Sequence, residues 1–513
     1  MKINKYLTIA IGLGLATLTS CDMDLTPSQY VEAEDPSTSI NSELTLNAMR
    51  RGIYSSYRST FYGGMSQPSE VMLDGFNATV DFGNNYGPIH RTDASFTSSD
   101  EDVQTLWNGY YGSIKDYNIF ISAAEKFAAE NEDYKAEANL YISEARCFRA
   151  YSYMELVRHF AKAYNPSTAS TDLGVPLVLE YNQQDKPHRA TVAAVYDQIK
   201  KDLDFAAENG LAQVAGEKRS EWLTVDALNM LYARYYLDTQ NYEKAAESAE
   251  EVLASDYELS STASDMRNEY IYDNGTEAIV QLPASVSESG SGTNSCYTNF
   301  STYTSLRQYG WPCLDVYVDP YFIPSQKLLD LYTSRDLRKT QWFSTNYYFV
   351  LLGGYFMSGV TTFTKYGGNP DLSSTYVPNA RQHVKPFMIG EAYLIAAEAY
   401  YKNNDPEAAK DVLNELQAKR GAQETEVNDE TLDDEWFRET VGEGLRFSCL
   451  KRWGRGFTGR EIQPYVEQQG LSYTGSNYEQ KSMSADDPHW VWPIPSYEIR
   501  VNSSLEHEQN PGY

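Results

Sequence analysis

The sequence predicts a mostly α-helical fold, in which antiparallel helix pairs stack into a superhelix with a long irregular loop face and minor β-hairpins. Two stretches, residues 227–253 and 391–416, indicate it, because each places a tyrosine three residues after an alanine and a second alanine nine residues later. These positions are Ala233, Tyr236 and Ala245 in the first stretch and Ala397, Tyr400 and Ala409 in the second. Alanines let two helices approach and the tyrosine fills their seam, as in a tetratricopeptide repeat (TPR).

Further helices must cover these two TPR-like hairpins, because a repeat cannot bury its apolar faces alone. Periodic segments that can do so lie near residues 100–130, 134–163, 191–210 and 434–455. For the helix over residues 191–210, we predict Thr191 as the N-cap and Gly210 as the C′ residue that ends the helix.

The N-terminus has the features of a lipoprotein signal peptide. Two lysines precede an apolar run over residues 6–18, which is shorter than the roughly 18 apolar residues of a spanning helix. The sequence Leu-Thr-Ser-Cys at residues 18–21 resembles a bacterial lipobox, in which the peptidase cuts before a cysteine that carries a diacylglycerol. We therefore predict removal of residues 1–20 and a lipid on Cys21. An ordinary signal peptide with an unrelated cysteine is the alternative.

The rest of the chain divides into a tether and three larger parts. Polar residues 21–45 form the expected lipidated tether, residues 46–257 the N-terminal helical part, and residues 381–513 the C-terminal helices. Residues 258–380 are rich in Ser, Thr, Gly, Tyr and Pro without a helical period, so we predict long loops and a β-hairpin that turns at Gly353–Gly354. Loops this long in a compact protein are usually functional.

The charge and composition narrow the class of partner. The chain has 71 acidic and 42 basic residues, a net charge of −29, and loses two lysines and no acid with residues 1–20, which leaves −31. Without a basic cluster we expect no nucleic-acid partner. Tyrosine is frequent, 42 of 513 residues, and its polar tip suits a wet binding surface, although most of these rings are expected to fill helix seams.

Three irregular stretches combine flat aromatic rings with hydrogen-bonding side chains. Carbohydrate recognition needs this combination, because a sugar presents apolar C–H faces and a rim of hydroxyls. The predicted ligand-binding residues are Tyr303, Arg307, Tyr309 and Trp311 in one stretch, Trp342 and Asn346 in a second, and Asp81, Phe82, Asn84 and Tyr86 in an early loop.

Cysteine and histidine positions predict no metal or redox centre. Cys147 and Cys449 fall in helical patterns and are expected to be buried. Cys296 and Cys313 lie 17 residues apart in the loop-rich part. We leave open whether these two cysteines form a disulfide. No Cys or His cluster has zinc spacing, so we predict no cofactor. We leave open only whether the protein binds a structural calcium ion.

No enzyme signature stands out. A glycosidase needs two carboxylates about 5 to 9 Å apart, and nothing singles out a pair among the 71 acids. The sequence contains no G-x-S-x-G, H-E-x-x-H or Walker A motif. The basic residues Arg446, Lys451, Arg452 and Arg455 lie in a stretch without P-loop spacing, and we expect them to pair with nearby acids.

Two C-terminal motifs resemble those of the SusD/RagB family of outer-membrane nutrient-binding lipoproteins. Residues 433–456 are similar to the family signature E-x-x-R-E…E-G-x-R…D-L-x-R-W, with Cys449 where the family has aspartate. The matching residues are Glu435, Arg438, Glu439, Glu443, Gly444, Arg446, Leu450, Arg452 and Trp453. Residues 492–513 resemble the P-I-P-x-x-E…N…Q-N-P-G-Y ending. The residues in place there include Asn502, Asn510, Pro511, Gly512 and Tyr513.

The resemblance implies a scaffold of about four TPR units with variable binding loops. It also implies an outer-membrane lipoprotein facing the cell exterior, and Asp22 and Asp24 beside Cys21 resemble the surface-export signal of Bacteroidetes lipoproteins. Such a protein captures a glycan without cleaving it and delivers it to a SusC-like TonB-dependent transporter, over which it acts as a lid. No family ligand residue transfers by motif, so the predicted site rests on composition.

Other classes of function stay open. Some relatives with this fold serve peptide uptake, and a peptide would bind through backbone partners rather than through stacked rings. A surface glycosidase would release products, and a purely structural repeat scaffold would bind its transporter but no nutrient.

Overall fold

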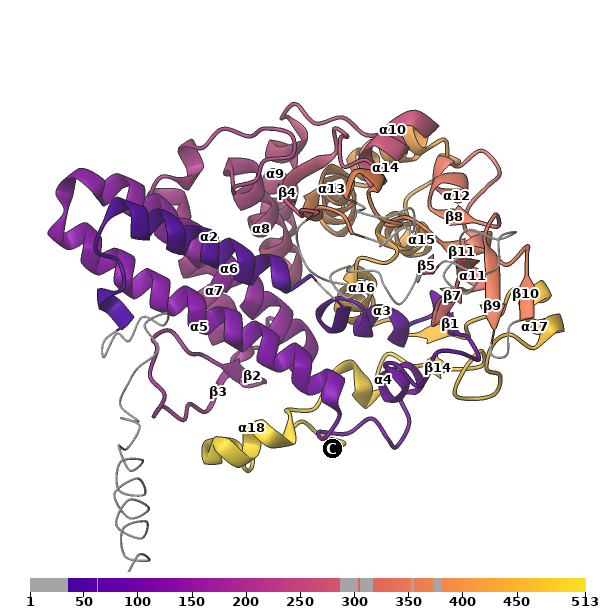
Figure 1. Cartoon of the computed structure of the whole chain (residues 1–513), viewed down its shortest axis with the longest axis horizontal. Helices are drawn as coiled ribbons and strands as arrows, with labels where there is room; N and C mark the ends of the chain where they lie inside the picture. The colour runs from indigo at the N-terminus through magenta and orange to yellow at the C-terminus, as the bar shows by residue number, and fades with distance from the viewer. Residues whose placement is uncertain (1–35, 62, 287–302, 305–316, 352–354, 373–380) are drawn as a thin grey trace, which may run out of the picture.

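A continuous array of α-helices makes up most of the protein (Figure 1). The computed structural model describes residues 36–61, 63–286, 303–304, 317–351, 355–372 and 381–513. Its helices are α2 (Glu43–Ser59), α3 (Pro68–Met72), α4 (Gly87–Arg91), α5 (Glu101–Glu130), α6 (Lys135–Phe160), α7 (Val192–Glu208), α8 (Val225–Asp238), α9 (Tyr242–Leu253), α10 (Ala263–Tyr270), α11 (Gln326–Asp330), α12 (Leu337–Gln341), α13 (Ile389–Lys402), α14 (Pro406–Arg420), α15 (Asp429–Thr440), α16 (Leu445–Trp453), α17 (Pro464–Gln469) and α18 (Ser496–Val501). The predicted mostly α-helical fold is confirmed.

The strands are short and belong to small sheets. They are β1 (Phe76–Ala78), β2 (Leu173–Pro176), β3 (Arg189–Thr191), β4 (Ala278–Leu282), β5 (Tyr303–Thr304), β6 (Tyr317–Val318), β7 (Phe322–Pro324), β8 (Phe343–Ser344), β9 (Tyr348–Leu351), β10 (Tyr355–Met357), β11 (Thr362–Phe363), β12 (Val384–Met388), β13 (Phe457–Thr458) and β14 (Ser482–Met483). One sheet has the order β10-β9-β6-β5, and the other strands pair two by two, as β1-β7, β2-β3, β4-β12, β8-β11 and β13-β14. In Figure 1 most of these strands lie beside the helical array, at the right.

Helices α5 to α9 pack in chain order, and α9 then packs on α13, which contacts α14 and α15. The two predicted hairpins are α8–α9 and α13–α14. The alanines that define them, Ala233, Ala245, Ala397 and Ala409, are fully buried, so the hairpin helices approach closely at these positions. Because α9 packs on α13, the N-terminal and C-terminal helices form one array.

Local capping sets several helix ends. The Thr191 side chain accepts the N–H of Ala194 at the start of α7, and Gly210 follows the helix end with a φ of 109°, both as predicted. Helix α2 begins at Glu43, within the expected tether of residues 21–45, because Ser42 and Thr45 form a reciprocal capping box.

The loop-rich part, residues 258–380, contains more regular structure than the sequence predicted. It holds α10, α11 and α12, each opened by a side-chain cap, and the strand β4. Five to eight residues are too few to produce a visible helical period. The predicted hairpin is present, since β9 and β10 pair antiparallel with Leu351 opposite Tyr355. Its turn at Gly353–Gly354 lies outside the described residues, as do Cys296 and Cys313.

The apolar core of the described residues has a main cluster within the helical array, a second cluster beneath the strands and a small third cluster that includes Leu471. Cys147 and Cys449 are buried free thiols, as predicted. Among the described residues, none of the helices combines the length and the apolar character needed to cross a membrane.

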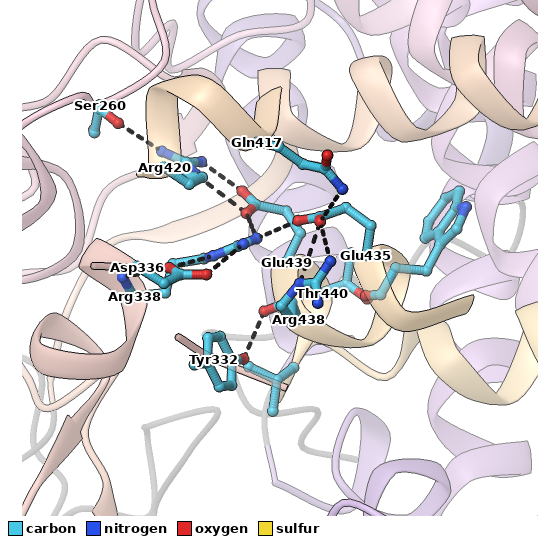
Figure 2. A network of polar contacts seen from close by, with 12 residues as sticks. Ser260, Tyr332, Asp336, Arg338, Gln417, Arg420, Glu435, Arg438, Glu439 and Thr440 are labelled. Atoms are coloured by element: carbon cyan, nitrogen blue, oxygen red, sulfur yellow. Dashed lines mark hydrogen bonds and ion pairs between the residues drawn. The ribbon is translucent and has the colours of Figure 1, made fainter. Parts of the chain in front are cut away.

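A buried ionic network connects the helical array to the strand-rich part (Figure 2). Arg338 of α12 contacts Glu435 of α15 at 2.6 Å and Glu439 at 2.8 Å. Arg420 at the end of α14 contacts Glu277 next to β4 at 2.7 Å, and also contacts Glu439. Each of these side chains is at most 5% exposed. The network therefore joins α12 and the segment before β4 to the consecutive helices α14 and α15, which are distant from both in the sequence.

The network lowers the pKa of Glu435. Burial alone would raise this pKa, but the guanidinium groups of Arg338 and Arg438 outweigh it and bring the pKa to about 2. Gln417 donates a further hydrogen bond to Glu435 at 2.9 Å. The carboxylate is therefore ionised and saturated with donors, which is the condition for a stable buried charge.

Other cations of the C-terminal motif also act structurally. Arg446 binds Asp74 at 2.8 Å, Arg452 binds Glu398 at 2.7 Å, and Arg455 contacts Asp433 at 3.4 Å, which confirms their expected pairing with acids. Lys451 is the exception, because its ammonium donates to the carbonyls of residues 158 and 161 rather than to a carboxylate. Burial lowers its pKa to about 7.

Replacement of Arg338 by methionine leaves three buried carboxylates without their common partner. We expect the Arg338→Met variant to lose about 3–5 kcal/mol of unfolding free energy, the usual cost of breaking a buried ion pair from one side. Urea denaturation measures it. The control Arg335→Met removes an exposed arginine and should change stability by less than about 1 kcal/mol. Equal stability of the two variants would contradict this role of the network.

Candidate functional site

The early loop predicted to bind ligand follows β1 and lies between two other segments. The backbone N–H of Thr79 donates to the carbonyl of Tyr321 at 2.9 Å, and that of Val80 donates to Leu471 at 2.9 Å. On the second side, Tyr473 N–H donates to the carbonyl of Ala78 at 3.1 Å. We call the surface formed by residues 79–93, 319–324 and 471–481 the loop face. It lies around β1, β7 and α4, at the lower right of Figure 1.

Buried charged groups hold the loop face from beneath. Arg460 donates to the carbonyls of Met72, Leu73 and His90, each at 2.6 Å, and so fixes both ends of the segment that contains the loop. Asp74, just before β1, pairs with Arg446 and with Lys327. These contacts connect the loop to α16 and α11, so its backbone is positioned by the scaffold.

The turn of the loop presents Asn84 to solvent. Gly83, Asn84 and Tyr86 all have left-handed backbones, with φ values of 59°, 62° and 51°. Glycine and asparagine tolerate this conformation, whereas a tyrosine adopts it only where the surroundings impose it. The Asn84 side chain is exposed and accepts a hydrogen bond from Arg91 at 2.8 Å. Its carbonyl oxygen is thereby oriented and its amide N–H groups remain available as donors.

A pair of tyrosines forms an aromatic surface beside this turn. The rings of Tyr473 and Tyr478 stack with centroids 5.1 Å apart. Tyr473 is 41% exposed, and the buried ring of Phe82 contacts it edge-on at 5.3 Å. A ring that is supported from beneath and open above can bind the apolar face of a ligand at little entropic cost.

Two carboxylates of the loop face, Asp81 and Asp319, interact with each other. Burial and the charge of Asp81 raise the pKa of Asp319 from 3.8 to about 6. Within the described part of the chain, the Asp319 Oδ1 atom accepts no hydrogen bond. The same atom is buried, so it is an acceptor beneath the surface rather than a contact open to a ligand.

The structure corrects the expectation that Trp342, Phe82 and Tyr86 are open stacking surfaces. Trp342 is fully buried, with Lys365 over its ring at 3.9 Å and Tyr270 against its edge. Phe82 is 3% exposed and Tyr86 8%. Rings covered in this way have no free face, so Trp342 is a packing residue and Phe82 supports Tyr473. Segments without apolar periodicity still contribute to the second core cluster.

The structure places three other predicted ligand-binding residues, Asn346, Asp81 and Tyr303, in different surroundings. Asn346 is exposed, and its neighbour Tyr347 packs on the small apolar cluster that includes Leu471 of the loop face. Asp81 is half-buried within the loop face. Tyr303 of β5 pairs with Val318 of β6, and Val318 directly precedes Asp319 in the chain. Arg307, Tyr309 and Trp311 lie outside the described residues, and their role stays a prediction.

Sequence reasoning missed Tyr473, Tyr478 and Asp319. The stretch LSYTGSNYEQ, residues 471–480, holds two tyrosines separated by small polar residues, the same signal that selected the other stretches. Within the described ranges, no group of three or more His, Cys, Asp or Glu residues forms a candidate metal site, so the open question of a structural calcium gains no candidate residues.

Comparison with known proteins identifies the family. Residues 353–513 match the SusD family model, and residues 27–237 match a related SusD-like model described as "Starch-binding associating with outer membrane". The chain belongs to the SusD family. No curated protein sequence matches it.

Solved structures share the fold of this SusD-family chain. A SusD superfamily protein from Bacteroides thetaiotaomicron is 23% identical, with a TM-score of 0.72 over 91% of this chain and 99% of that one. A SusD-like carbohydrate binding protein from Bacteroides vulgatus is 18% identical, with a TM-score of 0.71 over 91% and 98%. Surface glycan-binding protein A from Bacteroides fluxus is 18% identical, with a TM-score of 0.65 over 92% and 100%.

The raised pKa of Asp319 gives a testable titration. We expect Asp319 to lose its proton near pH 6, because Asp81 and burial disfavour the anion. Since this pKa lies above the ordinary value of 3.8, the associated stabilisation is complete below pH 3.8 and is lost as the pH rises through 6. Amidation with a carbodiimide, followed by peptide mass spectrometry across pH, measures the midpoint.

The Asp81→Asn variant should move the Asp319 midpoint to lower pH, because it removes the neighbouring negative charge. The control Asp330→Asn changes an exposed aspartate on α11 and should leave the midpoint in place. An unchanged midpoint in Asp81→Asn would contradict the coupling of the two carboxylates.

Proposed function

We propose that this SusD-family protein binds a glycan at the loop face and holds it without cleaving it. The observation that carries the proposal is the stacked pair of Tyr473 and Tyr478, in which Tyr473 is exposed. The rings can contact the C–H face of a pyranose, and the exposed Asn84 amide of the loop face can donate hydrogen bonds to its hydroxyls. The family supports the same class of ligand, because structural neighbours are described as carbohydrate-binding and glycan-binding proteins.

The proposal includes the position of the protein in the cell. A lipid on Cys21 would anchor the chain in the outer membrane facing the exterior, and a SusC-like TonB-dependent transporter would receive the captured glycan. The family description "associating with outer membrane" supports this arrangement. Replacement of Cys21 by serine should release the protein from the membrane fraction and abolish its copurification with a transporter. Retention of the variant in the membrane would contradict the anchor.

A glycosidase is the second candidate, and one observation favours it. Asp81 and Asp319 interact, and one of them has its pKa raised to about 6, as in enzymes that keep one carboxyl protonated as general acid while the other is ionised. Product formation distinguishes this candidate from binding alone.

The direct experiment titrates the mature protein, starting after Cys21, with neutral oligosaccharides, acidic oligosaccharides and peptides in a calorimeter. Each mixture is then chromatographed. We expect saturable binding of a glycan that is recovered intact. Released products would instead support the glycosidase, and a response to peptides alone would support peptide capture.

Replacement of Tyr473 by alanine should weaken neutral-glycan binding by about tenfold, because it removes the exposed half of the stacked pair. The matched control is Tyr497→Ala on α18, which removes a tyrosine of similar exposure, 47% against 41%, outside the loop face. Equal affinities in the two variants would contradict the proposed site.

A further inference from the structure

A second pocket, separate from the loop face, opens beside α2. It has a volume of 280 Å³, and α2, the segment before α8 and the end of β4 line it. Its lining includes Arg51, Tyr54 and Arg58 of α2, together with Glu221, Trp222 and Leu282. Pockets for drug-sized ligands measure about 300–1,000 Å³, so this pocket suits a single sugar-sized group rather than an extended chain.

The aromatic part of the pocket is rigid. Trp222 meets Tyr54 edge-on at 4.8 Å, and the guanidinium of Arg50 lies over the Trp222 ring at 3.8 Å. Arg50 is itself fixed by Glu144 at 2.6 Å, and the Tyr54 hydroxyl accepts the N–H of Leu223 at 2.8 Å. The half-buried indole is therefore held in place before any ligand arrives, which lowers the entropic cost of binding.

Two arginines and one carboxylate form the rim. Arg51 and Arg58 are seven residues apart, two turns of α2, so they project from the same side of the helix. Arg58 donates to the carbonyl of Pro283, which holds it at the pocket. Arg51 is exposed and, among the described residues, makes no hydrogen bond or ion pair. Glu221 is exposed on the same rim, which leaves a local excess of positive charge in a chain of net charge −29.

We propose that this pocket binds an acidic sugar residue. The C–H groups of the pyranose contact Trp222, the carboxylate receives charge-assisted hydrogen bonds from Arg51 and Arg58, and Glu221 accepts a hydroxyl. The inference rests on the proposed function only for the class of ligand. It adds a second site, in which the acidic sugar units of a glycan bind. The net negative charge of the chain would otherwise disfavour the binding of such units.

The test compares two disaccharides that differ in one group, a glucuronate-containing disaccharide and its neutral glucose counterpart with the same linkage. We titrate the mature protein with each and expect the Arg51→Gln variant to weaken the affinity for the acidic disaccharide by about tenfold or more. Affinity for the neutral one should be unchanged. The control Arg335→Gln removes an exposed arginine between α11 and α12 and should affect neither.

Salt gives a second readout that a purely structural role of Arg51 would not produce. Raising the ionic strength from about 0.05 to about 0.5 M should weaken acidic-disaccharide binding in the wild type, because it screens an exposed ion pair, and should have much less effect in Arg51→Gln. Equal affinity of wild type and Arg51→Gln for the acidic disaccharide would overturn the proposal. Binding of a sulfated but not a carboxylated disaccharide would overturn the assignment of a uronate.

These experiments can exclude either of the two proposed sites without excluding the other. If neutral glycans bind at Tyr473 but Arg51→Gln changes nothing, the second pocket is excluded and the loop face stands. If Arg51→Gln weakens the acidic disaccharide while Tyr473→Ala leaves every glycan unaffected, the loop-face proposal is excluded and the second pocket stands.

Discussion

The rest of the structure depends on a buried network of opposite charges at the junction of the helical array and the strands. Arg338 and Arg420 are enclosed by carboxylates from α15, from the loop before α12 and from the residue next to β4. A single partner could not offset the desolvation of a guanidinium, whereas several carboxylates with short contacts can. Because the partners come from distant parts of the chain, the network forms only when these elements are correctly assembled.

This constraint separates the part of the protein that fixes the fold from the part that faces a ligand. The residues that match the family signature, such as Glu435, Glu439 and Arg446, lie in the interior and bind other residues of the chain. The loop face is held by backbone hydrogen bonds and by Arg460 and Arg446, which leaves its outward side chains free to vary. A shared scaffold can therefore present different side chains on this face.

The sequence predicted the helices well, because alanine spacing and caps such as Thr191 are local signals. It selected the early loop, which belongs to the proposed site, but it did not give the burial of each ring. Trp342 and Phe82 occur in irregular segments, where no period reveals that another element covers them. Tyr473 faces solvent only because β1 and residues 471–473 pair across almost 400 positions of the chain, a contact that no local pattern indicates.

The central claim is that the stacked tyrosines of the loop face form the surface that receives a sugar. A crystal structure of the mature protein with a bound oligosaccharide, chosen as the tightest ligand in calorimetry, tests it most directly. The account predicts electron density for a pyranose ring within about 4 Å of Tyr473 or Tyr478. Density for an intact ligand elsewhere, with the loop face unoccupied, would contradict the account.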